Sequence, residues 1–180
     1  MRANEDVVPA GELAAAKARI REPERTRAAA HSGCFFCGSE HPTGLRLEFH
    51  ELKDGSVTAR FPCGHLFEGY REALHGGVIA ALLDSAMTNC LFAKGIVAVT
   101  AELTVRYLTP VRLDHPAEVT AAVMRVRGPL YYLQAELTQG RSLAARAQAT
   151  LMTSDRAARA RHPDHSPHTA TLLGSQRHQT

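Results

Sequence analysis

The chain has 180 residues, with 21 Lys and Arg against 18 Asp and Glu, and 44% of its residues are hydrophobic. This composition fits one compact domain. No apolar run approaches the roughly 20 residues of a membrane-spanning helix, and the N-terminus lacks the order of a secretory signal, so we expect no membrane association. Four Cys are too few for a disulfide-built scaffold, which favours reduced thiols in the cytoplasm.

The excess positive charge is predicted to lie outside the domain body. Residues 1–30 carry six basic and five acidic side chains, and residues 155–180 carry four and two, which leaves eleven of each for residues 31–154. A nucleic-acid-binding face concentrates Lys and Arg where the phosphates lie. We therefore expect no nucleic-acid partner.

The two ends of the chain differ in composition from the body. Residues 1–30 are rich in Ala, Arg and Glu and have apolar Leu13, Ala16 and Ile20 at helical spacing. Pro9 and Pro23 are interruptions, so we predict a flexible, partly helical arm. Residues 155–180 have too few large apolar side chains to form a core and are predicted to be a disordered tail. The globular domain is predicted over residues 31–154.

The body is predicted to consist mostly of strands. Residues 45–52 and 56–62 flank Lys53-Asp54-Gly55, which predicts a hairpin. Apolar and polar residues alternate from 99 to 107, which is the period of a half-buried strand. Further strands are predicted at residues 117–127, 130–138 and 142–153.

One segment has a helical period instead. After His75-Gly76-Gly77, apolar residues recur at i, i+3, i+4 and i+7 as far as Cys90, which predicts an amphipathic helix that ends near Gly95. Two strands, one long apolar helix and four further strands give an α+β order. The simplest packing is a curled antiparallel sheet of about six strands wrapped around the central helix.

Chemistry is expected at the start of this helix and two turns into it. Gly76 and Gly77 place unbonded amide N–H groups at a helix N-terminus, where the dipole favours an anion such as the oxyanion of an attacked acyl group. Asp84 interrupts an apolar run, in which a carboxylate is costly unless it is paired or used. The alternative for Asp84 is a solvated position on the helix face.

These residues resemble a known family. The stretch Leu74–Met87 and the strand Thr100–Pro110 look like the hotdog-fold thioesterases of the PaaI-like type, and residues 34–38 and 41–45 resemble a subgroup of that family. The resemblance covers residues 34–152. It implies a homodimer, or a dimer of dimers, whose sheets join edge to edge. It also implies hydrolysis of acyl-CoA thioesters at sites between subunits, with no metal and no cofactor.

The resemblance further implies a role for each matching position. Gly76, with Gly77 beside it, supplies the oxyanion amide, and His75 orients the loop or the thioester. Asp84 acts as general base on water or as nucleophile, and it reaches the site from the partner subunit. Thr100 provides a hydroxyl that helps to hold the water.

One region departs from the family pattern. Many members have an Asn or Gln shortly before the His-Gly-Gly, and here Glu68-Gly69-Tyr70 occupies that region. Glu68 either takes over the polar, substrate-binding role or is a surface residue. The alternative function is therefore a non-catalytic acyl-CoA-binding dimer that keeps the fold. A hydratase acting on enoyl-CoA is disfavoured, because no His follows Asp84 within the helix.

Cations for the phosphates of CoA are expected on the sheet. Arg106, Arg125 and Arg127 lie on or beside predicted strands. Arg127, with Gly128 at a predicted hairpin, is the preferred candidate for substrate binding. The alternative is that these arginines are solvated on the sheet face.

Cysteine spacing raises the question of a metal site. Cys34 and Cys37, with Cys63 and His65, are the arrangement that would make a four-ligand zinc site. The alternative, which we favour, is that these thiols are small buried residues in a turn. We therefore expect no bound metal.

Overall fold

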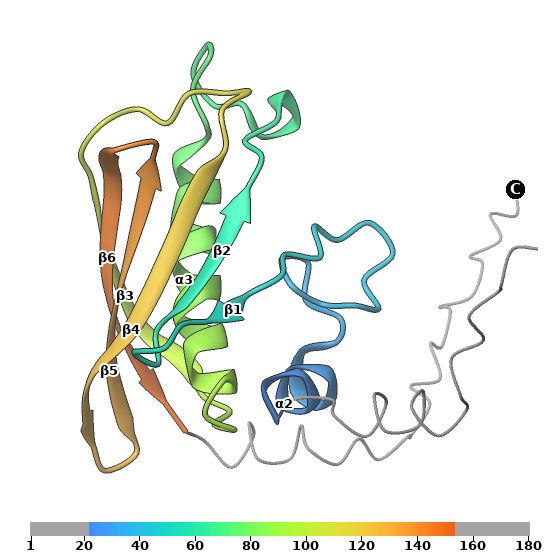
Figure 1. Cartoon of the computed structure of the whole chain (residues 1–180), viewed down its shortest axis with the longest axis vertical. Helices are drawn as coiled ribbons and strands as arrows, with labels where there is room; N and C mark the ends of the chain where they lie inside the picture. The colour runs from blue at the N-terminus through green and yellow to red at the C-terminus, as the bar shows by residue number, and fades with distance from the viewer. Residues whose placement is uncertain (1–21, 154–180) are drawn as a thin grey trace, which may run out of the picture.

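The computed structural model describes residues 22–153 (Figure 1). The elements follow in the order α2 (Glu22–His31), β1 (His50–Glu51), β2 (Val57–Phe61), a 3-10 helix (His65–Phe67), α3 (Gly76–Phe92), β3 (Val99–Tyr107), β4 (Ala117–Arg127), β5 (Leu130–Gln139) and β6 (Ser142–Met152). No helix among these residues is long and apolar enough to cross a membrane. The predicted tail, and the predicted arm as far as residue 21, lie outside the described residues.

The six strands form one antiparallel sheet in the order β1-β2-β4-β5-β6-β3. Three strands separate β2 from β3, so the segment that connects them must cross the sheet, and α3 makes this crossing. The sheet curls around the helix (Figure 1). The predicted α+β architecture, a six-stranded antiparallel sheet wrapped around one long helix, is confirmed.

Helix α3 is the centre of the hydrophobic core. The side chains of this helix that lose all contact with solvent are Leu82, Leu83, Ala86, Met87 and Cys90. Each such Leu or Met contributes about 1.5–3 kcal/mol through burial. Ser85 and Asn89 are buried too. Asn89 contacts Cys37 of residues 31–47, which are called the N-terminal segment below. The helix is therefore covered by the sheet and, on the side of Asn89, by residues that precede β1.

The N-terminal segment explains why the first predicted strand is wrong over most of its length. The sequence predicts a strand over residues 45–52, but only the two residues of β1 pair with β2. Leu45 and Leu47 instead donate their amides to the carbonyls of Phe35 and Phe36, each at 2.8 Å. A turn remote from β2 thus takes up the hydrogen bonds that would have extended β1.

Pro23 lies at the start of α2. It is the second residue of α2, in the first turn, where the missing N–H of Pro leaves no intrahelical hydrogen bond unmade. The residues before 22 lie outside the described part of the chain, so the interruption of a longer helix at Pro23 stays a prediction. Helix α2 continues to His31, where the chain turns toward α3.

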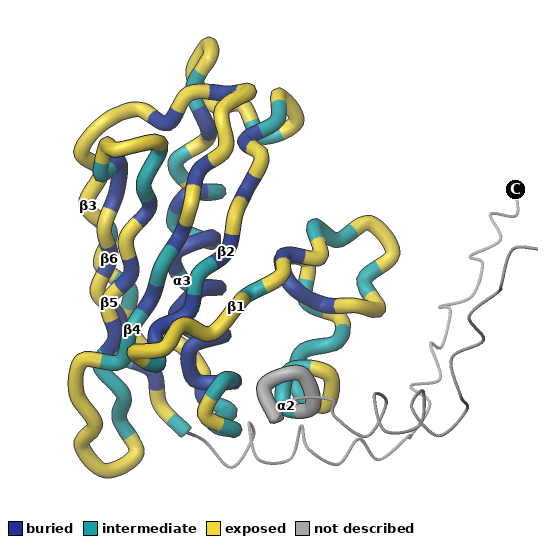
Figure 2. Tube along the Cα trace, in the orientation of Figure 1, coloured by how far each residue is buried: buried dark blue, intermediate teal, exposed yellow. Residues whose placement is uncertain are grey.

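Strand β3 lies at one edge of the sheet and pairs on one side only, with β6. The sequence predicts a half-buried strand, but most of β3 is exposed (Figure 2), including Val99 at 49% and Tyr107 at 52%. The other edge strand, β1, has only two residues. A long edge strand with exposed apolar side chains is a surface that a second chain can extend.

Candidate active site

The start of α3 is built around His75. This residue is the N-cap, with an extended backbone (φ −61°, ψ 132°), and its Nδ1 accepts a hydrogen bond from the Gly77 N–H at 2.9 Å. Its carbonyl accepts from the amides of Val78 and Ile79. The cap thereby uses one of the amides that a helix start leaves unbonded. The expectation that the amides of both glycines are free is wrong for Gly77.

Gly76 keeps an available amide. It is the first helical residue, whose N–H has no intrahelical acceptor, and no residue among 22–153 accepts a hydrogen bond from it. The Tyr107 hydroxyl donates to the Gly76 carbonyl at 2.9 Å. Strand β3 therefore holds the first turn of the helix in place, while the Gly76 N–H stays free to bind an anion. The sequence analysis did not assign this positioning contact of Tyr107.

Asp84 lies two turns along α3 and is hydrogen-bonded to the same strand. Thr100 Oγ1 donates to Asp84 Oδ1 at 2.7 Å, and the Asp84 side chain is half-buried. The register of β3 shifts between Thr100 and Glu102, and a bulge of this kind redirects the side chains beside it. Within the described part of the chain, no group donates to the second carboxylate oxygen, which leaves it open to water or substrate.

The Asp84 carboxylate and the Gly76 amide do not meet within one chain. The two residues are eight positions apart on α3, and a rise of 1.5 Å per residue places them about 12 Å apart along the helix axis. A base and an oxyanion donor must each come within about 3 Å of the reacting group. A reaction centre that used both groups would therefore take them from two different chains.

The loop before α3 contains the region that departs from the family pattern. The Glu68 carboxylate accepts a hydrogen bond from the Glu72 N–H at 2.6 Å and lies 3.9 Å from His65. Gly69 packs closely on His75, because a Cβ at residue 69 would lie 2.8 Å from the His75 Cα. Glu68 thus closes the loop at the surface, and Gly69 offers no side chain to a substrate.

Arg127 is the last residue of β4, and Gly128 begins the turn to β5. Gly128 has a φ of 59°, in the left-handed region that favours glycine, and Arg127 is exposed. Figure 1 shows this turn at the lower end of the sheet, whereas α3 begins at the upper end. The structure does not bring the two residues to the helix start, and their contact with CoA stays a prediction. The nearby Arg125 guanidinium lies 5.5 Å above the Tyr132 ring.

The four-residue zinc site considered from the sequence does not form in this chain. Cys63 is buried and its Sγ donates to the Phe61 carbonyl at 3.6 Å. His65 Nε2 lies 2.8 Å from the Asp114 carboxylate. Neither residue belongs to the single group of three or more potential metal ligands found among residues 22–153.

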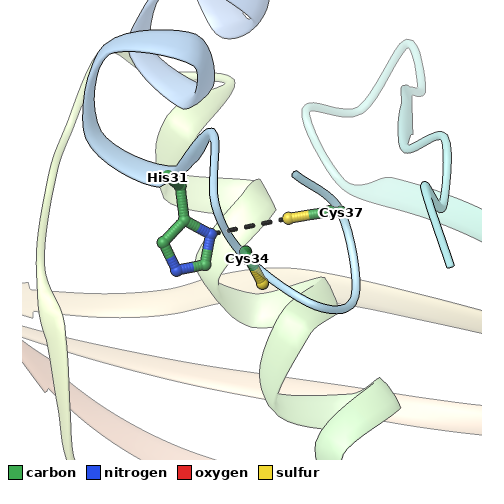
Figure 3. A group of neighbouring side chains, drawn as sticks. All are labelled: His31, Cys34 and Cys37. Carbon is green, nitrogen blue, oxygen red and sulfur yellow. Dashed lines mark hydrogen bonds between the residues drawn. The ribbon is translucent and has the colours of Figure 1, made fainter. Parts of the chain in front are cut away.

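That group consists of His31, Cys34 and Cys37 (Figure 3). The sequence analysis missed His31, although it stands three residues before Cys34, the same interval that separates the two cysteines. Burial lowers the pKa of His31, while the nearby Asp84 carboxylate acts to raise it. Burial raises the pKa of the Cys37 thiol to about 11, against the effect of a hydrogen bond from Asn89.

A family comparison covers the part of the chain that contains these residues. Residues 72–144, which contain the start of α3, Asp84 and Thr100, match the family model of the thioesterase superfamily. The resemblance to the hotdog-fold thioesterases is confirmed. Acyl-coenzyme A thioesterase THEM4 of Rattus norvegicus is 26% identical over 112 residues, which cover 61% of this chain and 48% of the relative. The chain thus spans about half the length of this thioesterase.

Solved structures share the fold. A crystal structure of a thioesterase superfamily protein is 21% identical, with a TM-score of 0.65, over 80% of this chain and 76% of that one. PaaI of E. coli, from the phenylacetic acid degradation operon, is 17% identical with a TM-score of 0.57, over 61% and 84%. A Streptococcus mutans protein bound to acetyl-CoA is 18% identical with a TM-score of 0.56, over 60% and 88%.

Proposed function

We propose that the protein hydrolyses acyl-CoA thioesters to the free acid and CoA, at sites formed between two copies of the chain. The observation that carries the proposal is the hydrogen bond from Thr100 to Asp84, on an apolar helix whose first amide, at Gly76, is available. These are the base or nucleophile and the oxyanion donor that acyl transfer needs. The acetyl-CoA bound to the Streptococcus mutans protein of this fold supports the substrate class.

Asp84 of one subunit and Gly76 of the partner subunit act on opposite sides of the thioester carbonyl. As general base, Asp84 takes a proton from water while the water oxygen bonds to the carbonyl carbon. The negative charge moves to the carbonyl oxygen, which accepts a hydrogen bond from the Gly76 N–H of the partner subunit. Collapse of this intermediate breaks the C–S bond, and the CoA thiolate takes up the proton.

Asp84 as nucleophile uses the same groups in a different order. The carboxylate bonds to the carbonyl carbon and CoA leaves, so that a mixed anhydride forms, and water then hydrolyses it. In either route, Thr100 holds one carboxylate oxygen at 2.7 Å and directs the other toward the substrate. The two routes remain alternatives for Asp84.

The second subunit is proposed to add along the edge of β3. The backbone of this strand is paired on one side only, and Val99 and Tyr107 are about half exposed. Two further apolar side chains in the loop before α3, Leu66 and Tyr70, are 87% and 90% exposed. A partner that covers β3 and this loop would bury apolar surface beside Gly76. Dimers of this kind can pair further into tetramers.

The test is CoA release from short, medium and aromatic acyl-CoAs, followed with a thiol reagent. Asp84→Asn keeps the volume of the side chain and an acceptor for Thr100 but removes the base, so we expect kcat to fall by about 10²–10⁴-fold. Asp114→Asn, at an exposed carboxylate that contacts His65, is the matched control and should retain activity. Wild type and Asp84→Asn that are equally active, or equally inert, would overturn the proposal.

The second candidate, an acyl-CoA-binding dimer without turnover, is favoured by the loop at residues 68–72. Neither Gly69 nor Glu68 offers the side-chain amide that many family members carry there, and the Glu68 carboxylate is bonded to a loop amide. Calorimetric binding of an acyl-CoA without CoA release would establish this function in place of hydrolysis.

A further inference from the structure

We propose that His31, Cys34 and Cys37 bind one Zn²⁺ ion, which fastens the N-terminal segment to helix α3. The donor atoms of the three side chains all lie within 4.8 Å of one another, and His31 Nδ1 is 3.5 Å from Cys37 Sγ (Figure 3). The Asp84 carboxylate lies near His31, but this proposal does not rest on the proposed hydrolysis. It also departs from the expectation, from the sequence, that no metal is bound.

The distances are close to those of a tetrahedral zinc site. Zn–S bonds of about 2.3 Å and Zn–N bonds of about 2.0 Å at tetrahedral angles separate sulfur from nitrogen by about 3.5 Å and two sulfurs by about 3.8 Å. The pair His31 and Cys37, at 3.5 Å, already has the spacing of two zinc ligands. Movements of about 1 Å or less would bring all three donor atoms to that spacing.

The local sequence explains why the three side chains converge. His31 is the last residue of α2, and its carbonyl accepts the Cys34 amide at 3.1 Å, while the Cys34 carbonyl accepts the Gly38 amide at 2.8 Å. Two successive turns, each three to four residues long, therefore wrap around one point. A Cβ at Gly38 would lie 2.2 Å from the Ser32 carbonyl oxygen, so only glycine allows the chain to close this tightly.

Helix α3 supplies the groups that surround the three ligands. Asn89, which is 5% exposed, donates its side-chain amide to Cys37 Sγ at 3.4 Å and to the Ser85 carbonyl at 2.9 Å. The His31 ring packs edge-on against Phe92, with 5.3 Å between the ring centres. A hydrogen bond to a ligand atom is the outer-shell contact that orients metal ligands in proteins. These two contacts place the site directly on α3.

The charge of the site fits a divalent, thiophilic ion. Two thiolates and a neutral imidazole carry a charge of −2, which Zn²⁺ neutralises, and binding releases the two thiol protons to solvent. Sulfur and nitrogen ligands select zinc over magnesium or calcium. Three protein ligands leave a fourth position for water, and the half-exposed His31 and Cys34 allow solvent to reach it.

The ion would hold more than the turn that contains its ligands. Leu45 and Leu47 donate their amides to the carbonyls of Phe35 and Phe36, which lie between the two cysteines. Fixing Cys34 and Cys37 on one ion therefore fixes these carbonyls as well. The bound metal would stabilise the whole segment from His31 to Leu47 against α3.

The first experiment measures metal binding by the full chain. The reduced protein, freed of metal by a chelator, is titrated with Co²⁺ and then with Zn²⁺. We expect one equivalent of Co²⁺ to give the visible bands of a tetrahedral site and a thiolate charge-transfer band, and one equivalent of Zn²⁺ to abolish both. Asn89→Leu should weaken binding by about 10–100-fold, and Cys34→Ser and His31→Ala by more.

Two control variants keep the assignment specific. Cys63→Ala and His65→Ala remove a thiol and an imidazole outside the group and should leave stoichiometry and spectrum unchanged. A reduced wild type that gives no tetrahedral Co²⁺ spectrum would overturn the proposal. An unchanged spectrum in Cys34→Ser would do the same, because the ligands would then lie elsewhere, for example among the four His of residues 155–180.

The second experiment tests whether Zn²⁺ stabilises the N-terminal segment against α3, and it uses the wild-type protein only. Hydrogen exchange of the wild-type amides is compared with and without Zn²⁺. We expect Zn²⁺ to slow exchange at Leu45 and Leu47 by at least about tenfold and to leave Val119 unchanged, a residue of β4 that pairs with both β2 and β5. Equal exchange of Leu45 and Leu47 in both forms would show that the ion, even if bound, does not fasten the segment.

Discussion

The proposed active site takes Asp84 and Gly76 from two different chains, and this proposal is open to a direct test. Asp84→Asn removes the carboxylate, and Gly76→Pro removes the oxyanion donor. Pro is tolerated at the first position of a helix, and the residue before it must be extended, as His75 is with φ −61° and ψ 132°. A Cβ at residue 76 would meet the Tyr107 ring at 3.6–3.7 Å, which is ordinary contact. Both variants should therefore fold.

The expected activities follow from the separation of about 12 Å along α3. Each variant alone should lose roughly 100-fold or more of its CoA-release activity. When the two are mixed and allowed to exchange subunits, about half of the dimers are mixed. In a mixed dimer one site combines both substitutions and the other has none. The mixture should therefore regain about a quarter of the wild-type activity.

The assay is CoA release before and after the two variants exchange subunits, with mixed dimers counted by native mass spectrometry. Chains that each carried a complete site would give no gain, because every site would still hold one substitution. Mixed dimers without regained activity would refute the two-chain geometry. The unfolding free energy of Gly76→Pro should stay within about 1 kcal/mol of wild type, which excludes misfolding as the cause of its inactivity.

Three further substitutions test individual contacts. Thr100→Val removes the 2.7 Å hydrogen bond to Asp84, and kcat should fall about tenfold while the melting temperature is unchanged; unchanged kcat would contradict the role of the hydroxyl. His75→Ala removes the helix cap and should lower the unfolding free energy in urea by about 0.5–2 kcal/mol. Gly69→Ala forces a Cβ to 2.8 Å from the His75 Cα and should destabilise the protein by about 1–3 kcal/mol, whereas Gly64→Ala, with no atom within 4 Å, should not.

The elements with strong local signals were predictable from the sequence. Strand β3, predicted over residues 99–107, and strand β4, predicted over 117–127, have these bounds in the structure. Alternating side chains and flanking turn residues are local properties of the sequence, so no tertiary information is needed to find them. The Gly-Gly start of α3 is a local signal of the same kind.

The elements that depend on partners distant in the sequence could not be predicted from the sequence. Residues 45–49 alternate as a strand would, but the amides of Leu45 and Leu47 bond to the turn at Phe35 and Phe36, and no local pattern indicates that choice. The exposure of β3 was missed for the same reason. Alternating apolar residues predict an apolar face, but they do not show whether the same chain covers that face.

In the candidate site, too, residues with a local signal were identified and contacts that depend on the fold were missed. His75, Gly76 and Asp84 were found from local pattern and resemblance, but the use of the Gly77 amide in the cap depends on the side-chain orientation of His75. His31 had a local signal in its spacing to Cys34 and Cys37. It was missed because further metal ligands were sought downstream, at Cys63 and His65, which lie outside the cluster.

Strand β3 is hydrogen-bonded to α3 at two points, from Thr100 to Asp84 and from Tyr107 to Gly76. Its outer edge is unpaired. The strand that would recruit a second copy is thus the strand that sets the positions of both proposed catalytic groups. Specific activity should accordingly vanish on dilution to monomer, and substitutions along this edge should change catalytic rate without touching substrate. Evolutionary selection for tighter or weaker dimers would therefore also change the catalytic rate.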